Sequence, residues 1–170
     1  MPVQRLNHAV LYVRDVERSS AFYRDVLGFR AKMERPGAVF LQAEGSTNDH
    51  DLGLFQIGAA AGASTAGRST VGLYHLAWEV DTLVELARIR DALLQAGALV
   101  GASYHGTTKA LYAQDPDGIE FEVSWLLPAD LITPEVTEGA AMTAALDLDR
   151  EIARYGEQTR GGVGVSVAAG

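Results

Sequence analysis

The sequence predicts an α+β protein in which a β-α-β-β-β module occurs twice. The two modules are expected to pack into one curved mixed β-sheet around a cavity, followed by a C-terminal helical extension. Apolar runs rich in β-branched and aromatic residues alternate with segments of helical spacing, and the same order recurs in both halves of the chain. A single module is too small to bury both faces of its sheet, so two should pack together.

The first module begins with an apolar run at residues 6–13, which predicts a strand. Asp15 is a suitable N-cap for the helix that follows, because its side chain can accept hydrogen bonds from free backbone amides. Gly28 is the expected end of that helix. Two further strands are predicted at about residues 38–43 and 51–57.

The second module repeats this order from a strand at residues 73–80. Thr82 and Glu85 form a capping box, in which both side chains bind backbone amides at the start of the next helix. Gly97 is the expected end of this helix. Further strands are predicted near residues 110–114 and 119–125.

The two halves share a register. The same number of residues separates His8 from His75 and the helix cap Asp15 from Thr82. The predicted domain covers residues 1–127, with module one at about 4–57, a Gly-, Ala- and Ser-rich linker at 58–70 and module two at 71–126. The repeat predicts that equivalent strands present equivalent residues to one shared cavity.

Residues 128–170 are predicted to form an extension with one helix at about 142–155 and a flexible Gly-rich tail at 161–170. No recognisable chemistry appears in this segment. We expect it to cover the core or a neighbouring subunit.

Composition excludes several classes of function. The net charge is −8, with 14 scattered basic residues, which argues against nucleic-acid binding. No apolar stretch is long enough to cross a membrane, and no signal peptide is evident. The chain contains no cysteine, which excludes thiolate metal sites and a cysteine nucleophile. A cytoplasmic homo-oligomer is expected.

Two histidines and a glutamate form the candidate metal site. His8 and His75 occupy equivalent places in the first strand of each module, and Glu122 lies in the last strand. A carboxylate in an apolar strand is costly unless it is paired or bound to a metal. Two imidazoles and one carboxylate leave neighbouring coordination positions open, as in non-haem iron(II) oxygenases. Alone, each histidine could be a core residue, and Glu120 shares the strand face of Glu122.

Residues 4–126 resemble the vicinal oxygen chelate superfamily, which includes glyoxalase I, antibiotic-resistance proteins and type I extradiol dioxygenases. The stretch from His105 through Tyr112 and the Asp-Pro-Asp-Gly turn to Glu122 is similar to the extradiol dioxygenase signature. Residues 49–55, Asp-His-Asp-Leu-Gly-Leu-Phe, are similar to the strand that carries the acid–base histidine of that family. The resemblance is to a single-domain branch, because only one pair of modules is present.

The resemblance implies catalytic roles for the remaining histidines. His8, His75 and Glu122 would hold Fe(II) in a metal cavity, although the same ligands also suit Mn(II). The catalytic residues, whose side chains would act beside the metal, would be His50, His105 and Tyr112. The implied reaction is extradiol (meta) ring cleavage of a catechol-type substrate by dioxygen.

Two alternatives stay open in the sequence. A glyoxalase-like lyase or isomerase would use a fourth ligand from the end of the first module, where Gln56 could coordinate through its amide oxygen. A non-catalytic ligand-binding or resistance protein of the same superfamily would sequester a small molecule without converting it.

Overall fold

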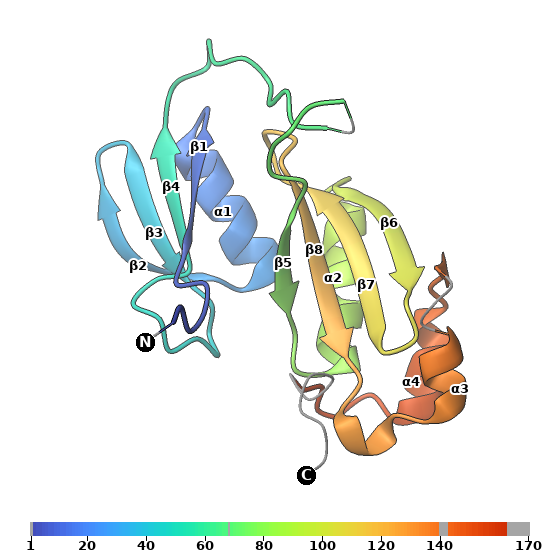
Figure 1. The fold of residues 1–170 in the computed structure, drawn as a ribbon. Helices are drawn as coiled ribbons and strands as arrows, with labels where there is room; N and C mark the ends of the chain where they lie inside the picture. The colour runs from blue at the N-terminus through green and yellow to red at the C-terminus, as the bar shows by residue number, and fades with distance from the viewer. Residues whose placement is uncertain (1, 68, 140–142, 163–170) are drawn as a thin grey trace. The chain divides into compact units, whose positions relative to one another are not determined.

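The computed structural model describes residues 2–67, 69–139 and 143–162. The chain divides into two compact units, which follow one another in Figure 1 from blue to red. Unit 1 comprises Met1–Thr65 with Asp115–Gly118, and unit 2 comprises Ala66–Gln114 with Ile119–Gly170. The predicted α+β class and the doubled module are confirmed, because each unit contains a β-α-β-β-β series with its own mixed sheet.

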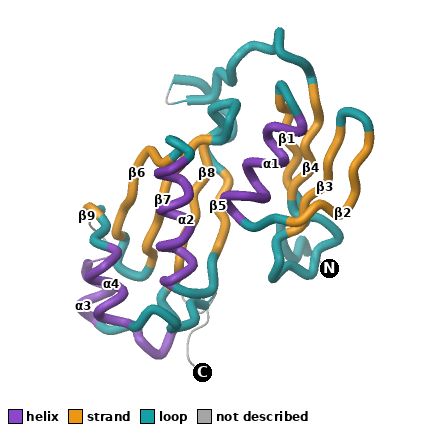
Figure 2. Tube along the Cα trace, turned by 180° about the vertical axis from the view of Figure 1, so that it is seen from behind, coloured by secondary structure: helices purple, strands orange, loops and turns teal. Residues whose placement is uncertain are grey.

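Unit 1 is a four-stranded sheet with a helix on one face, as Figure 2 shows from behind. The strands lie in the order β1-β4-β3-β2; β1 is parallel to β4, and the other pairs are antiparallel. The elements are β1 (Ala9–Val13), α1 (Val16–Leu27), β2 (Arg30–Arg35), β3 (Ala38–Gln42) and β4 (Leu52–Gln56).

Helix α1 has the ends that the sequence predicts. The Asp15 carboxylate accepts a hydrogen bond from the Arg18 backbone N–H at 3.0 Å. Gly28 follows the last turn with a φ of 75°, a left-handed conformation that a residue with a Cβ adopts only at a cost. Val16, Tyr23 and Val26 are buried on one side of α1, so burial of this apolar stripe holds the helix to the sheet.

Unit 2 repeats the arrangement and adds one strand, β9 (Ala144–Ala145). Its sheet has the order β5-β8-β7-β6-β9, with β5 parallel to β8 and α2 packed on one face. The repeated elements are β5 (Leu76–Glu79), α2 (Leu83–Gln95), β6 (Leu99–Tyr104), β7 (Thr108–Gln114) and β8 (Glu120–Leu126).

The capping box at the start of α2 is half formed. The Thr82 hydroxyl accepts a hydrogen bond from the Glu85 N–H at 3.4 Å, as predicted. The Glu85 carboxylate instead pairs with Arg88 at 2.7 Å. Gly97 lies just beyond the helix with a φ of 64°.

The extension differs from the single predicted helix. Residues 144–145, which were expected to be helical, form a short strand because they pair with β6. Residues 163–170 of the predicted flexible tail lie outside the described part of the chain. The observed elements are a 3₁₀ turn η1 (Ala129–Leu131), α3 (Pro134–Gly139), β9 (Ala144–Ala145) and α4 (Leu148–Tyr155).

None of the helices in the described ranges is long and apolar enough to cross a bilayer. The packing of both modules around one cavity stays a prediction.

Candidate functional site

Two predicted site residues of unit 1, His8 and His50, lie side by side. His8 directly precedes β1, and the centroid of its ring is 4.5 Å from that of His50. The His50 ring also meets Phe40 edge-on at 5.0 Å. His8 is exposed, whereas the His50 side chain is only 18% exposed. The structure thus places a predicted metal ligand beside a predicted acid–base group.

The loop between β3 and β4 is held by the buried Asp51 carboxylate. This carboxylate accepts hydrogen bonds from the Ser46 hydroxyl at 2.7 Å and the Asn48 side-chain amide at 2.8 Å. The same amide group donates to the Asn7 carbonyl oxygen at 2.7 Å, and the Ala9 N–H donates to the Asp51 carbonyl at 2.9 Å. These bonds tie the loop to the start of β1 and so bring both histidines together.

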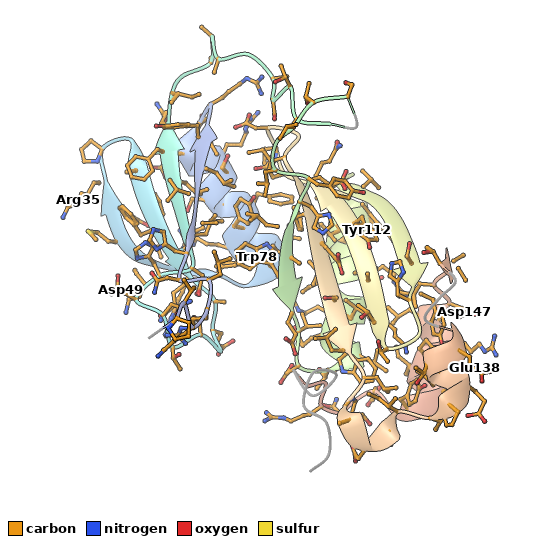
Figure 3. The ribbon with its side chains drawn as sticks, in the orientation of Figure 1. Arg35, Asp49, Trp78, Tyr112, Glu138 and Asp147 are labelled. Atoms are coloured by element: carbon orange, nitrogen blue, oxygen red, sulfur yellow. The ribbon has the colours of Figure 1, made fainter. Side chains whose placement is uncertain are left out.

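Each of these histidines has a polar neighbour at Nδ1. His8 Nδ1 is 2.7 Å from Asn7 Oδ1, and His50 Nδ1 is 3.0 Å from Asp49 Oδ2. The hydrogen bond from His50 lowers the pKa of the Asp49 carboxyl group. Asp49 is labelled in Figure 3, at the loop. With Nδ1 engaged in this way, Nε2 is the nitrogen of each ring that can serve a ligand or substrate.

Two predicted metal ligands of unit 2, His75 and Glu122, contact each other. His75 Nε2 lies 3.3 Å from Glu122 Oε2, and the two side chains are 23% and 14% exposed. His75 directly precedes β5. Glu122 lies in the neighbouring parallel strand β8, where it is paired with Ala77 of β5. Of the two glutamates that share this strand face, Glu122 is the one whose carboxylate contacts His75.

The two ring nitrogens of His75 differ in their surroundings. His75 Nδ1 is buried, and no hydrogen-bond partner for it is found among the described residues. A buried polar nitrogen without a partner costs free energy unless a ligand or water completes it. An imidazole and a carboxylate that converge in this way fit a divalent metal ion, since both are metal donors.

Tyr112 and His105 continue this cluster along unit 2. The Tyr112 ring lies 5.9 Å from the His75 ring, and Tyr112 is paired with Glu122 across β7 and β8. Tyr112 Oη is 3.2 Å from His105 Nε2. Burial, followed by the negative charge of Glu122, raises the pKa of the Tyr112 phenol, which is labelled in Figure 3. Tyr112 therefore keeps its proton at neutral pH and can donate it in a hydrogen bond.

The predicted metal triad is divided between the units, with His8 in unit 1 and His75 and Glu122 in unit 2. Among the described residues, no group of three His, Cys, Asp or Glu side chains is gathered closely enough to hold a metal. Two imidazoles and a carboxylate nevertheless fit an iron(II) or manganese(II) ion by donor chemistry.

Gln56, the predicted alternative ligand, has another role. Its Oε1 accepts a hydrogen bond from the Val16 N–H at 3.1 Å, which satisfies a free amide at the start of α1. Gln56 pairs with Val13 at the far end of β1, five residues beyond His8, which corresponds to about 16 Å along a strand.

The pairing register identifies a different position as the counterpart of Glu122. Glu122 is opposite Ala77, two residues after His75, whereas the residue opposite Val10, two residues after His8, is Gly53. The equivalent position in unit 1 therefore carries no side chain. A Cβ at Gly53 would meet Val10 and Phe40 at 3.5 and 3.6 Å, an ordinary van der Waals contact, so steric crowding does not require glycine there.

Sequence reasoning missed Thr143, whose hydroxyl oxygen lies 3.3 Å from His105 Nδ1. The two residues are 38 positions apart, and an exposed threonine carries no local sign of such a contact. Only the fold of the extension brings it to the site.

The fold and these clusters define a class of protein: a duplicated β-α-β-β-β module with a histidine at the head of the first strand of each copy. A family model described as the Glyoxalase/Bleomycin resistance protein/Dioxygenase superfamily matches residues 5–123. The chain belongs to this superfamily. The observed repeat and the matched residues cover the same part of the sequence.

Two relatives are named as ring-diol dioxygenases. Catechol-2,3-dioxygenase of Bacillus subtilis (strain 168) is 31% identical over 118 residues, which are 69% of this chain and 40% of that protein. Biphenyl-2,3-diol 1,2-dioxygenase 3 of Rhodococcus globerulus is 31% identical over 137 residues, which are 77% of this chain and 66% of that protein. The chain thus spans less than two thirds of the length of either relative.

A solved structure supports the fold. It is a glyoxylase/bleomycin resistance protein/dioxygenase domain from Frankia sp. EAN1pec, with a TM-score of 0.59 and 20% sequence identity. The match covers 72% of this chain and 92% of that one. At this identity the likeness shows the fold alone.

Proposed function

We propose that the protein is an extradiol dioxygenase that cleaves the ring of a catechol-type substrate with dioxygen at a mononuclear iron(II) site. The observation that carries the proposal is the linked cluster of unit 2. There the ligand pair His75 and Glu122 adjoins Tyr112, and Tyr112 adjoins His105. This cluster combines metal donors with groups that can hold and move protons.

The relatives support the same reaction. Two proteins that are 31% identical to this chain are named for dioxygenase action on catechol and on biphenyl-2,3-diol. Both names describe an aromatic ring with neighbouring hydroxyl groups, so a catecholic ring is the substrate class that we assign to this chain.

His8, His75 and Glu122 would hold the metal. An iron(II) ion, when bound, supplies Lewis acidity to the two substrate oxygens and a path for electrons from the ring to dioxygen. The reaction breaks a ring carbon–carbon bond beside the hydroxyl groups, and both atoms of dioxygen enter the ring-opened product. The product is of the muconic semialdehyde type, which is yellow.

Tyr112 would orient the substrate. Its neutral phenol can donate a hydrogen bond to a substrate oxygen, while its own oxygen lies within hydrogen-bond distance of His105 Nε2 at 3.2 Å. This hydrogen bond stabilises negative charge on the substrate without a full proton transfer. His105 would in addition close the pocket next to the ring.

His50 would supply the proton that is needed when the oxygen–oxygen bond breaks. An imidazole suits this step because a ring nitrogen can hold a proton and pass it to a neighbouring oxygen. Asp49 at Nδ1 supports the protonated ring, and Phe40 restricts its orientation.

The proposed reaction needs open coordination positions for two substrate oxygens and for dioxygen, so three protein ligands suit it better than four. Gly53, the register counterpart of Glu122, offers no fourth donor, and the Gln56 amide oxygen is occupied by Val16. Both observations favour the dioxygenase over a glyoxalase-like lyase or isomerase.

The test is to load the full chain with iron(II) without oxygen, add catechol and then admit air. We expect a yellow ring-opened product that forms with iron and not with zinc. Several substituted catechols should be tried, because the chain spans only part of its relatives. No ring opening with any catechol, together with turnover of a glutathione hemithioacetal, would overturn the proposal. Tight catechol binding without conversion would overturn it in favour of a binding protein.

A further inference from the structure

The C-terminal extension reaches the ring of His105. In the described structure both nitrogens of this ring have a hydroxyl neighbour: Tyr112 Oη at 3.2 Å from Nε2 and Thr143 Oγ1 at 3.3 Å from Nδ1. Tyr112 belongs to the sheet, whereas Thr143 belongs to the segment that leads into β9. The ring is thus held between the core of unit 2 and its extension.

We propose that Thr143 is a positioning residue for His105 and that the extension is thereby part of the site rather than a cover for it. A neutral imidazole donates at one nitrogen and accepts at the other. If Thr143 donates to Nδ1, the proton lies on Nε2 and is donated to the oxygen of Tyr112. The Tyr112 proton then points away from His105, where the Glu122 carboxylate accepts it in this structure and a substrate oxygen can compete for it. In this respect the inference rests on the proposed function.

Backbone pairing fixes Thr143 in place. The next two residues form β9, in which Ala144 pairs with Tyr104 and Ala145 with Ser103. The Leu146 N–H also donates to a β6 carbonyl oxygen at 3.4 Å. Strand β6 ends at Tyr104, directly before His105. The same strand therefore positions His105 and, through its pairing with β9, Thr143.

A buried ion pair holds the extension to the turn that carries His105. Lys109 Nζ lies 3.2 Å from Glu151 in α4 and donates to the Gly106 carbonyl oxygen at 2.5 Å. The Lys109 side chain is fully buried and that of Glu151 is 7% exposed. Three aromatic rings lie around the ammonium group at 4.8 to 5.8 Å, namely those of Tyr104, Trp125 and Tyr155.

We call the ion pair between Lys109 and Glu151 the latch. Through Lys109 it connects the turn that carries His105 with the extension. Lys109 binds the carbonyl oxygen of the residue next to His105, and through Glu151 it binds the helix that follows Thr143 and β9. Loss of the latch should therefore loosen Thr143 and the His105 turn together.

The experiment compares Thr143→Val, which removes the hydroxyl at nearly constant volume, with Thr143→Ser, which keeps it. In the full chain with ¹⁵N-labelled histidine, long-range ¹H–¹⁵N spectra identify which ring nitrogen of His105 carries the proton. We expect the Nε2–H form in the unaltered chain and in Thr143→Ser, and a mixture of both forms in Thr143→Val. The signal of His105 is assigned by its loss in His105→Gln.

Kinetics with the iron(II)-loaded protein and catechol give a second readout. Thr143→Val should lower kcat on the order of tenfold with little change in KM, and Thr143→Ser should restore it. An Nδ1–H form in the unaltered chain, or identical spectra and kcat for Thr143→Val, would overturn the positioning role. If no chain cleaves catechol but the tautomer still responds to Thr143, the proposed function fails and the positioning role stands.

Discussion

At the scale of single residues, the candidate site depends on which nitrogen or oxygen of each side chain is already engaged. His8 and His50 have polar neighbours at Nδ1, His105 has hydroxyl neighbours at both nitrogens, and His75 has a carboxylate at one and no described partner at the other. A single histidine in a strand predicts little. The partners of each ring show which nitrogen is left for a ligand or a proton.

Glu122 and Glu120 provide a matched pair of variants, because both side chains lie on one face of β8 and only Glu122 pairs with His75. We expect Glu122→Gln to weaken iron(II) binding by about 10-fold to 100-fold and Glu120→Gln to leave it nearly unchanged. Metal titration followed by calorimetry measures both. Equal binding by the two variants would remove Glu122 from the ligand set.

Tyr23 predicts a pH effect on stability in unit 1. Its hydroxyl donates to Asp115 at 3.2 Å, and burial, followed by the charge of Asp115, raises the pKa of this phenol well above 10.0. Above about pH 10 the unfolded chain loses this proton while the folded chain retains it, so stability falls by about 1.4 kcal/mol per pH unit.

Tyr23→Phe should remove this pH dependence at a cost of about 1 kcal/mol below pH 10, since one buried hydrogen bond is lost. Urea unfolding at pH 8 and pH 11 measures the free energy of unfolding of the unaltered protein and of Tyr23→Phe, and the gap is the difference between these two values. The gap should narrow or reverse at pH 11. A constant gap would show that Tyr23 titrates normally.

At the scale of elements, the sequence predicts what local chemistry determines. The caps at Asp15, Gly28 and Thr82 have the expected conformations, because a helix end depends on a few neighbouring residues. Six predicted strands are found as well, with ends that differ from the prediction by at most three residues.

Besides β9, two strands of the modules were not predicted, and both have weak patterns. Strand β2, Arg-Ala-Lys-Met-Glu-Arg, is almost wholly exposed at the edge of its sheet, so no apolar alternation marks it. Strand β6 contains glycine, alanine and serine, and it gains its outer neighbour only from the distant β9. Hairpin pairing with the next strand, β3 or β7, rather than propensity, forms both strands.

Only the Lys109 half of the latch could have been predicted from the sequence. Lys109 is a charged residue within the apolar run of β7, and the cost of burying an unpaired charge applies to it as it does to Glu122. What the sequence does not contain is the partner, because Glu151 lies in a helix far along the chain.

Replacement of Glu151 tests the latch energetically. Burial lowers the pKa of Lys109 and the Glu151 carboxylate opposes this, so Glu151→Gln leaves a buried cation without its counter-ion. We expect a loss of about 3 kcal/mol in the free energy of unfolding. Asp149→Asn, which breaks an exposed pair with Arg90 at 3.4 Å on the same helix, should cost less than about 1 kcal/mol.

Thermal and urea unfolding of both variants measure this difference. Lys109→Met combined with Glu151→Leu should recover most of the lost stability, because an apolar pair needs no counter-ion. Equal effects of Glu151→Gln and Asp149→Asn would mean that the latch does not stabilise the extension.

At the scale of the whole molecule, the repeat in the sequence and the two observed units agree in order and in pairing. The parallel pairs β1–β4 and β5–β8 share one register, which places His8 and His75 at equivalent strand starts and makes Gly53 the equivalent of Glu122 in the first module. The repeat thus contains two histidines and one carboxylate. Superfamily membership follows from this architecture, whereas the choice of reaction depends on the residues around the ligands.

The most direct test of the account is the fate of isotopically labelled oxygen. The full chain, loaded with iron(II) and supplied with catechol under ¹⁸O₂, should give a ring-opened product whose mass shows that both atoms of dioxygen were incorporated. Glu122→Gln should give none of this product, and Glu120→Gln should give it normally. Recovery of intact catechol from the unaltered chain, or a product that contains no labelled oxygen, would contradict the assignment as an extradiol dioxygenase.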